Sequence, residues 1–372
     1  MKQIILLSFV LLLGASACNG PGPDDLVNCT FPQEELLSNY ADEIIIPRFD
    51  ELAAALLFME SSTQGFYANP TPGLLVEIQI TFGLSYRAYQ KCSPFAFGPG
   101  LINGISFRER MNTFPTDVSA IAQNISAGSS VASSEKSEVG LPAVGYLLFG
   151  EEGTTTAEIV TLFTTDANAA NRRAYFQQLV AEMKTTVSSM VQQWSATGGN
   201  YREGFVSNTG MADGSSLSLL VNEMSFDFET LKNFKFKVPL GKLNGGVVLP
   251  SSVEAFYSGG SLELAILQLT AFRELYLGIG SNGADGVGLY EFLVCLETKS
   301  GGVLLADRIT TQFEAIADKL DLVPNPLSQA LVNDKQLVDN TYEQMQMMVP
   351  LLKFEMPTAL GVQVTYQDND GD

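Results

Sequence analysis

The side chains that could do chemistry in this chain do not include histidine. Its 372 residues contain 41 Asp and Glu, 21 Lys and Arg, and no His. This composition excludes a Ser-His-Asp triad, a Cys-His dyad and the common His-bearing zinc sites. Acid–base chemistry would need Asp, Glu, Tyr, Lys or Cys. A metal site would be rich in oxygen ligands, which favours hard cations.

Four polar or amphipathic side chains lie in largely apolar stretches and are candidates to line a cleft. They are Arg87, Asp117, Tyr146 and Arg273. An arginine in an apolar helix is usually paired, and Asp117 is a candidate partner. The favoured interpretation is a buried ion pair or helix cap that holds two parts of the molecule in register. Ligand binding is the alternative.

The acidic residues exclude one class of partner. A formal net charge of −20 repels phosphate backbones, so we expect no nucleic-acid partner. The segment DNDGD (368–372) places Asp368, Asp370 and Asp372 at alternate positions, as in a calcium loop. Its glycine is misplaced and the bidentate Glu of such a loop is missing. We therefore interpret the segment as a solvated acidic tail.

The apolar stretch EVGLPAVGYLLFG (138–150) is predicted to form a helix. Pro142 suits the first helical turn, where its missing N–H needs no partner, and Gly150 suits the end. Gly145 lacks a side chain in mid-helix at a cost of about 1 kcal/mol relative to Ala, which suggests close approach of another helix or a ligand. By its chemistry alone the stretch is a core helix.

The segment GLPAVGYLLFG within this stretch resembles the signature of the imelysin-like family, also called the M75 peptidase family. That signature is Gly-x-His-x-x-Glu followed by a similar apolar run. The resemblance spans nearly all of the mature chain and implies two helical bundles with a cleft between them near this helix. Further similar segments are FPTDVSAI (114–121), KVPLGK (237–242), EAFYSGGSLEL (254–264) and TALGVQVTYQDNDGD (358–372).

The sequence departs from the family pattern where the chemistry should lie. Gly140 matches the motif glycine, but Pro142 stands in the place of the His and Gly145 in the place of the Glu. A His and a Glu three residues apart share a helix face and can jointly bind a metal, whereas Pro and Gly offer no side-chain donor. We therefore expect no catalytic residue, no metal ligand and no resident cofactor. If the chain does bind an ion, iron and calcium are the candidates.

Helix periodicity dominates the chain, and the predicted fold class is all-α. We predict an N-terminal helical bundle over 33–200 and a C-terminal one over 214–372. SYRAY (85–89) and AFREL (271–275) occupy comparable places in the two halves, which allows an internal duplication.

Two prolines should interrupt the predicted helices, Pro47 as a kink and Pro350 as a break. Strand alternation is scarce, and VQVTYQD (362–368) is the best candidate. The predicted helical segments outside 138–150 are 34–61, 73–92, 114–125, 168–195, 215–235, 261–280, 302–323 and 326–360.

The N-terminal residues MKQIILLSFVLLLGASA (1–17) have the pattern of a cleaved signal peptide. Cys18 follows three small residues and resembles a bacterial lipobox cysteine, which is lipidated after cleavage. Residues 18–32 begin with a Gly/Pro-rich stretch that suits a tether. We expect an exported lipoprotein of the outer membrane, facing the periplasm or the surface and held by acyl chains alone. An ordinary signal followed by an incidental cysteine is the alternative.

Three cysteines remain once Cys18 is lipidated. They are Cys29, Cys92 and Cys295, so at least one stays free. An exported compartment permits disulfides. Order along the chain makes Cys29–Cys92 a candidate pair, and whether it forms is left open.

The preferred function is a lipid-anchored, imelysin-like binding or accessory protein of the cell envelope without peptidase activity. It would capture a small ligand, a metal complex or an envelope protein, and family resemblance links it to uptake of iron or other nutrients. One alternative is a metallopeptidase or metal-binding enzyme that uses carboxylate ligands, supported only by the excess of Asp and Glu. The other is a structural lipoprotein that binds another protein.

Overall fold

A computed structural model describes residues 29–130 and 136–365. The predicted signal peptide (1–17), Cys18 and the predicted acidic tail (368–372) lie outside the described residues. Among the residues that are described, no helix is long and apolar enough to cross a membrane.

Helices form almost all of the regular structure of the described residues, which confirms the predicted all-α class. The first half contains α1 (Gln33–Asn39), the π-helical η2 (Tyr40–Ile45), α2 (Ile46–Ala68), α3 (Pro72–Cys92), α4 (Phe107–Met111), α5 (Val118–Ala127), α6 (Gly140–Phe149), α7 (Thr156–Thr164), α8 (Ala169–Trp194) and α9 (Tyr201–Ser207). The second half contains α10 (Ser216–Lys232), the π-helical η6 (Asn233–Lys237), α11 (Ser261–Leu277), α12 (Leu289–Cys295), α13 (Leu305–Leu320), α14 (Leu327–Asn333), α15 (Lys335–Pro350), the π-helical η9 (Leu351–Glu355) and α16 (Met356–Leu360).

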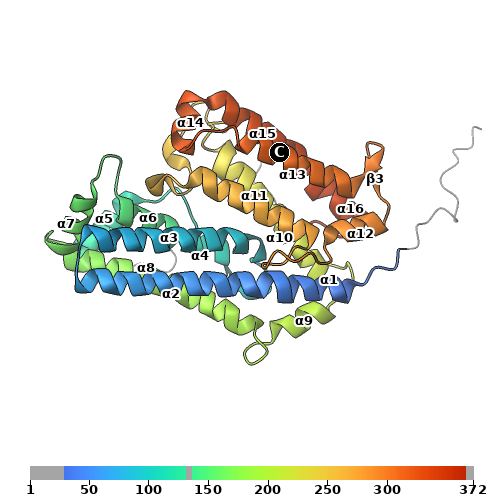
Figure 1. Ribbon diagram of the computed structural model, residues 1–372, viewed down its shortest axis with the longest axis horizontal. Coiled ribbons are helices and arrows are strands. Elements are labelled where there is room, and N and C mark those ends of the chain that lie inside the picture. Colours follow the sequence, from blue (N-terminus) through green and yellow to red (C-terminus); the bar gives the residue numbers. More distant parts are fainter. Residues whose placement is uncertain (1–28, 131–135, 366–372) are drawn as a thin grey trace, which may run out of the picture.

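The helices of the two halves lie on opposite sides of the molecule (Figure 1). Helix α2 packs along α3 on one side and along α8 on another, and α13 packs along α15. Helix α11 contacts both α3 and α13, so it belongs to the layer where the two halves meet. The predicted boundary between two bundles, between 200 and 214, stays a prediction.

Helix α3 illustrates how the sequence specifies these elements. The Thr71 side chain accepts a hydrogen bond from the Leu74 N–H at 3.3 Å, and Pro72 occupies the first turn, where no N–H is needed. Ile78 and Phe82, spaced at about one helical turn, are both buried. The buried face of α3 packs against α2 and α6.

The two prolines change the helix type instead of stopping the helix. Pro47 lies in the first turn of α2, directly after η2, and Pro350 ends α15 directly before η9. A proline cannot donate the usual helical hydrogen bond, and the Glu43 carbonyl, four residues before Pro47, accepts a hydrogen bond from the Ser281 N–H at 2.8 Å instead. The predicted helix 326–360 is interrupted instead at Asp334, between α14 and α15, where the backbone leaves the helical region (φ −132°).

The strand predicted at 362–368 does not form in its described part, because residues 362–365 pair with no strand. The Asn222 side chain of α10 satisfies this backbone instead. Its Nδ2 donates to the Gln363 carbonyl at 3.0 Å, and its Oδ1 accepts from the Thr365 N–H at 2.8 Å. The described strands form two short hairpins, β1 (Leu101–Ile102) with β2 (Ile105–Ser106) and β3 (Lys299–Ser300) with β4 (Val303–Leu304).

A buried arginine joins the two halves. Arg48 of α2 is 1% exposed, and its Nη2 donates to Glu274 Oε2 of α11 at 2.9 Å. Its Nη1 donates to the carbonyl oxygens of Lys91 at 3.2 Å and Ala271 at 3.4 Å. Glu274 is 35% exposed, so solvent screens its side of the pair, but removing Glu274 would leave the buried Arg48 charge without its carboxylate partner. Arg48 therefore fixes α2, α3 and α11 relative to one another.

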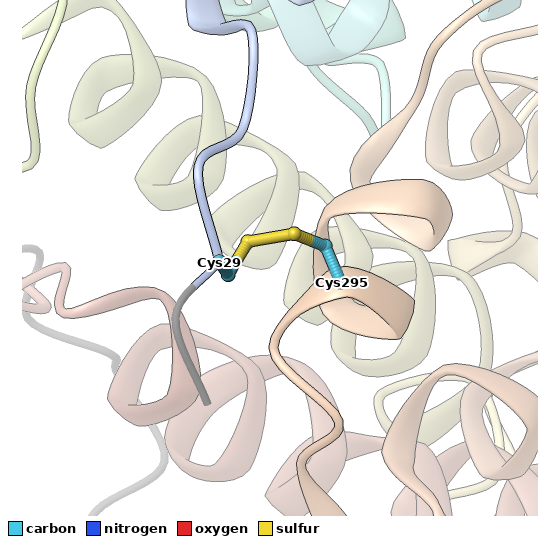
Figure 2. The surroundings of a disulfide bond; sticks show 2 residues. All are labelled: Cys29 and Cys295. Atoms are coloured by element: carbon cyan, nitrogen blue, oxygen red, sulfur yellow. A yellow bond between two sulfur atoms is a disulfide. The ribbon is translucent and has the colours of Figure 1, made fainter. Parts of the chain in front are cut away.

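A disulfide joins the N-terminal segment to the second half (Figure 2). Cys29 pairs with Cys295 at the end of α12, so the candidate pair Cys29–Cys92 is wrong. Cys92 is buried at the end of α3, and its thiol donates to the Arg48 carbonyl at 3.2 Å. Close to the disulfide, the rings of Phe31 and Phe292 stack with centroids 4.2 Å apart. Chain order misled the prediction because residues 29–32 cross to the second half before α1 begins.

Candidate functional site

Gly140, the motif glycine, is required by the backbone at the start of α6. Its φ is +74°, in the left-handed region that side chains disfavour. A Cβ at this position would lie 2.4 Å from the Met111 carbonyl oxygen. Helix α6 therefore begins in close contact with the end of α4, and Gly140 has a structural role.

Pro142 and Gly145 face a tightly packed pit that is lined by aromatic, aliphatic and hydroxyl-bearing side chains. A Cβ at Gly145 would lie 3.2 Å from the Phe82 ring, which occupies the space beside the helix. The adjoining pit has a volume of about 10 Å³, too little for a ligand. Its described lining, which includes Phe114 and Phe256, contains no carboxylate, thiol or imidazole. These residues do not fit a bound metal.

Arg87 and Asp117 do not meet. Arg87 pairs with Glu263 of α11 at the surface, where both side chains are about half exposed. Asp117 is the N-cap of α5, and its Oδ1 accepts a hydrogen bond from the Ala120 N–H at 2.9 Å. The candidate pair is therefore wrong, because the unpaired N–H groups of a helix start hold the carboxylate. The Arg87–Glu263 pair does connect α3 to α11, although it is not buried.

Tyr146 and Arg273 also lie apart. The half-buried Tyr146 packs its ring edge against Tyr257, with centroids 5.1 Å apart. Arg273 is at the surface, with its Nη2 3.9 Å from Glu314 Oε1. The four predicted cleft residues are therefore not gathered around one cavity.

A larger cavity lies elsewhere, between the two halves of the chain. Its volume is about 620 Å³, in the range of sites for small organic ligands. We call it the α3–α10 cavity, because α3, α4, α10, η6 and α11 supply most of its wall. The lining residues fall within 89–114 and 226–268. Phe234 and Leu243 are exposed and line it as well.

A buried ion pair lies in the wall of this cavity. Lys235 Nζ is 2.6 Å from Glu254 Oε2, and the two side chains are 3% and 0% exposed. Lys235 also donates to Gln90 Oε1 at 2.8 Å. Gln90 Nε2 and Asn112 Nδ2 donate to Glu254 Oε1 at 2.8 and 2.6 Å. Burial lowers the pKa of Lys235, although the Glu254 charge opposes this shift. The side-chain amides of Gln90 and Asn112 thus supply hydrogen bonds that offset part of the desolvation cost of burying the Lys235–Glu254 pair.

Asp227 is a second buried charge in this wall. Its Oδ2 accepts hydrogen bonds from Ser93 Oγ at 2.8 Å and from Gln268 Nε2 at 2.9 Å. Its Oδ1 lies 3.7 Å from Arg108 Nη1. Burial raises the pKa of Asp227, against the opposing effect of Arg108. Asp227 and Lys235 are both shifted toward their neutral forms, a pattern that is enriched at functional sites.

Arg108 is held in place from several directions. Ser106 and Glu109 form a capping box that starts α4 just before Arg108. Arg108 Nη1 donates to the Ser93 carbonyl at 2.9 Å, and Nη2 donates to Glu223 Oε2 at 2.7 Å. Its guanidinium also lies over the Phe226 ring, 4.8 Å from the centroid. Arg108 therefore joins α4, η3 (Ser93–Phe95) and α10 around the cavity.

The residues of this site carry no recognisable motif in the sequence. Asp227 and Lys235 lie among aromatic residues in SFDFETLKNFKFK (225–237), and the spacing of this segment predicts only a helix. Charged side chains between apolar ones were the available signal. That signal is ambiguous, because the same spacing also suits an amphipathic surface helix. Glu254, the partner of Lys235, lies in another segment of the chain.

Comparisons with known proteins agree with this architecture. The sequence profile of the imelysin family (Peptidase M75) matches residues 45–346. No curated protein is similar enough to count as a relative. A solved structure described as a putative iron-regulated protein A precursor from Parabacteroides distasonis is 14% identical, with a TM-score of 0.71. It matches over 88% of this chain and 95% of its own.

A second solved structure has the same fold. An imelysin-like protein from Psychrobacter arcticum is 15% identical, with a TM-score of 0.67. The match covers 90% of this chain and 97% of that one. At such low identity the two structures establish the shared fold and nothing about ligands.

Proposed function

This chain belongs to the imelysin family, and we propose that it is a ligand-binding protein of the bacterial cell envelope without peptidase activity. The observation that carries the proposal is the α3–α10 cavity, which has a volume of about 620 Å³. Both halves of the chain contribute polar side chains to it, and Asp227 and Lys235 are buried there in a network of ion pairs and amides. Such a wall positions a ligand more precisely than a loop would.

The surroundings of α6 support the loss of peptidase activity. Pro142 and Gly145 carry no donor side chain, and Phe82 fills the adjacent space. Among residues 29–130 and 136–365, no group of three or more Asp, Glu and Cys side chains is placed to hold a metal ion. A hydrolytic role would need ligands from some other arrangement.

An envelope location and a role in the uptake of iron or other nutrients complete the proposal. The lipobox-like sequence before Cys18 supports export and lipidation. The structural neighbour from Parabacteroides distasonis is described as iron-regulated, and on that likeness we propose that this chain also acts in the uptake of iron or other nutrients.

The lipid anchor can be tested by metabolic labelling with a palmitate analogue, which should modify the parent protein and not Cys18→Ser. Equal labelling of both would contradict the lipid anchor.

Binding can be tested with calorimetry and native mass spectrometry of the purified protein against ferric citrate, haem, calcium and neutral sugars. Phe234→Ala removes an exposed ring from the cavity wall, and Phe58→Ala removes an exposed ring from α2 as a matched control. We expect at least one probe to bind with an affinity that Phe234→Ala weakens by about tenfold, equivalent to about 1.4 kcal/mol. Phe58→Ala should bind like the parent. If no probe shows a Phe234-dependent signal, or if chelator-sensitive proteolysis appears, the proposal fails.

A protein-binding role has one supporting observation. Val76, Ile80 and Leu84 are exposed at four-residue spacing on α3, so they form an apolar stripe along one helix face. Leu57 and Phe58 on the adjacent α2 are exposed as well. Exposed apolar surface of this kind can mark a protein contact. Ile80→Lys should abolish any partner complex while leaving Phe234-dependent ligand binding unchanged, which separates the two roles.

A further inference from the structure

We propose that the α3–α10 cavity binds an uncharged, hydroxyl-rich ring compound of the size of a mono- or disaccharide. This inference rests on the proposed function, because it specifies the ligand class of the same cavity. Three properties of the cavity wall lead to it: its balanced and internally paired charges, its amide and hydroxyl groups, and its aromatic faces.

The charges of the cavity wall select against ions of either sign. The lining contains as many acidic as basic side chains, namely Glu109, Asp227 and Glu229 against Arg108, Lys235 and Lys237. Several of these already have partners close by. Lys235 is 2.6 Å from Glu254, Arg108 is 2.7 Å from Glu223, and Glu229 is 3.0 Å from Lys232. An ion that enters such a cavity loses its hydration and gains no net attraction, whereas a neutral ligand has a much smaller desolvation cost.

The polar groups of the wall suit hydroxyls. Gln90, Asn112, Gln268, Thr113 and Thr230 all line the cavity, and their side chains can both donate and accept hydrogen bonds. Gln268 is 2% exposed; its Nε2 donates to the protein, while its Oε1 accepts no hydrogen bond. A buried acceptor without a donor is unfavourable, so a rotation of the Gln268 side chain that brought this oxygen within reach of a ligand O–H would recover part of that cost. A hydroxyl both donates and accepts, which matches this mixed wall.

Aromatic rings complete the complementarity. Tyr89, Phe114, Phe226 and Phe234 contribute to the lining, and Leu243 adds an aliphatic contact. Phe226 is already covered by Arg108, whereas Phe234 is 43% exposed and available. A sugar ring has an apolar C–H face and a polar hydroxyl edge, so it can contact an aromatic face and amides at once. The cavity offers both kinds of surface.

The test is calorimetric titration of the full mature protein with glucose, galactose, N-acetylglucosamine, maltose and cellobiose. Spermidine, citrate, ferric citrate and haem form the ionic arms. We expect at least one sugar to bind with a Kd of about 1 mM or tighter, and Phe234→Ala to weaken it by about tenfold. Gln268→Met, which keeps the side-chain length and removes the amide, should weaken the same sugar, and Phe58→Ala should not. Binding should also be insensitive to salt, because no charge is neutralised.

The outcomes separate the ligand class from the function. If only an ionic probe binds, with an affinity that depends on Phe234 and falls with salt, the sugar proposal is overturned while the cavity remains the binding site. If no sugar binds and no ion binds, both proposals fail. If a sugar binds equally well to the parent and to a folded Phe234→Ala, the assignment to this cavity is overturned.

Discussion

At the residue scale, the atoms that surround a glycine decide whether a larger side chain can replace it. Gly140 combines a left-handed backbone with a carbonyl oxygen 2.4 Å from where a Cβ would lie. Gly83 in α3 is also a glycine within a helix, yet a Cβ there would have no neighbour within 4 Å. The two glycines look alike in the sequence and differ in backbone conformation and in what surrounds them.

We expect Gly140→Ala to lower the free energy of unfolding by about 1–3 kcal/mol or more, because the new methyl group adds a clash to an unfavourable φ. Gly83→Ala should raise it by about 0.5–1 kcal/mol, because alanine restricts the unfolded chain and favours the helix. Urea denaturation followed by circular dichroism measures both. Equal effects of the two substitutions would show that the start of α6 is not packed against α4 in this way.

At the element scale, an ion pair attaches the loop that follows η6 to α15. Lys242 Nζ is 2.6 Å from Asp339 Oδ1, and Lys335 Nζ is 2.8 Å from Oδ2 of the same carboxylate. Burial alone would raise the pKa of Asp339, but its bonds to Lys242 and Lys335 outweigh burial and lower that pKa. The adjacent Leu243 lines the α3–α10 cavity, so this ion pair also positions part of the binding site.

The stability that Asp339 contributes should disappear in acid. A carboxyl with a lowered pKa stabilises the folded state above its unfolded pKa, and this contribution is lost as the pH falls through the folded pKa. Asp339→Asn should therefore be less stable than the parent at pH 7, by about 1 kcal/mol. The difference should narrow once the pH falls below about 4. Denaturation at several pH values tests this, with the exposed Asp318→Asn on α13 as control. A difference that stays constant with pH would refute the role of the Asp339 charge.

At the scale of the whole molecule, two connections join distant parts of the chain. The Cys29–Cys295 disulfide spans 266 residues, and the ion pair between the buried Arg48 and Glu274 links α2 to α11. The Arg48–Glu274 pair lies in the layer where the two halves meet, whereas the disulfide attaches the N-terminal segment to the end of α12. A disulfide over such a long loop stabilises mainly by restricting the unfolded chain.

Replacing both Cys29 and Cys295 by serine should lower the free energy of unfolding by about 2–4 kcal/mol. Mass spectrometry of a non-reduced digest should recover the peptides of Cys29 and Cys295 linked to each other. Cys92 should react with a thiol reagent only after unfolding, because its side chain is buried and burial raises its pKa. A linked peptide that contains Cys92 would contradict the connectivity.

The sequence by itself determined the class of the fold and most of its helices. Apolar spacing placed α3 almost to the residue, and the family resemblance indicated the imelysin fold that the profile match and the solved structures support. These features depend on neighbours within a few turns of one helix, which the sequence displays directly. The absence of histidine likewise follows from the sequence without any structure.

Only the tertiary structure decided which residues meet. Glu263 is the partner of Arg87, Cys295 is the partner of Cys29, and Lys235 meets Glu254 in the wall of a cavity. In two of these pairs the partners are separated by more than a hundred residues, and in the third by the largely irregular segment 236–253. Periodicity carries information along one element, whereas a buried charge is specified by whatever element packs over it. The candidate binding site is made of such contacts, and for that reason it emerged from the fold and not from the motif.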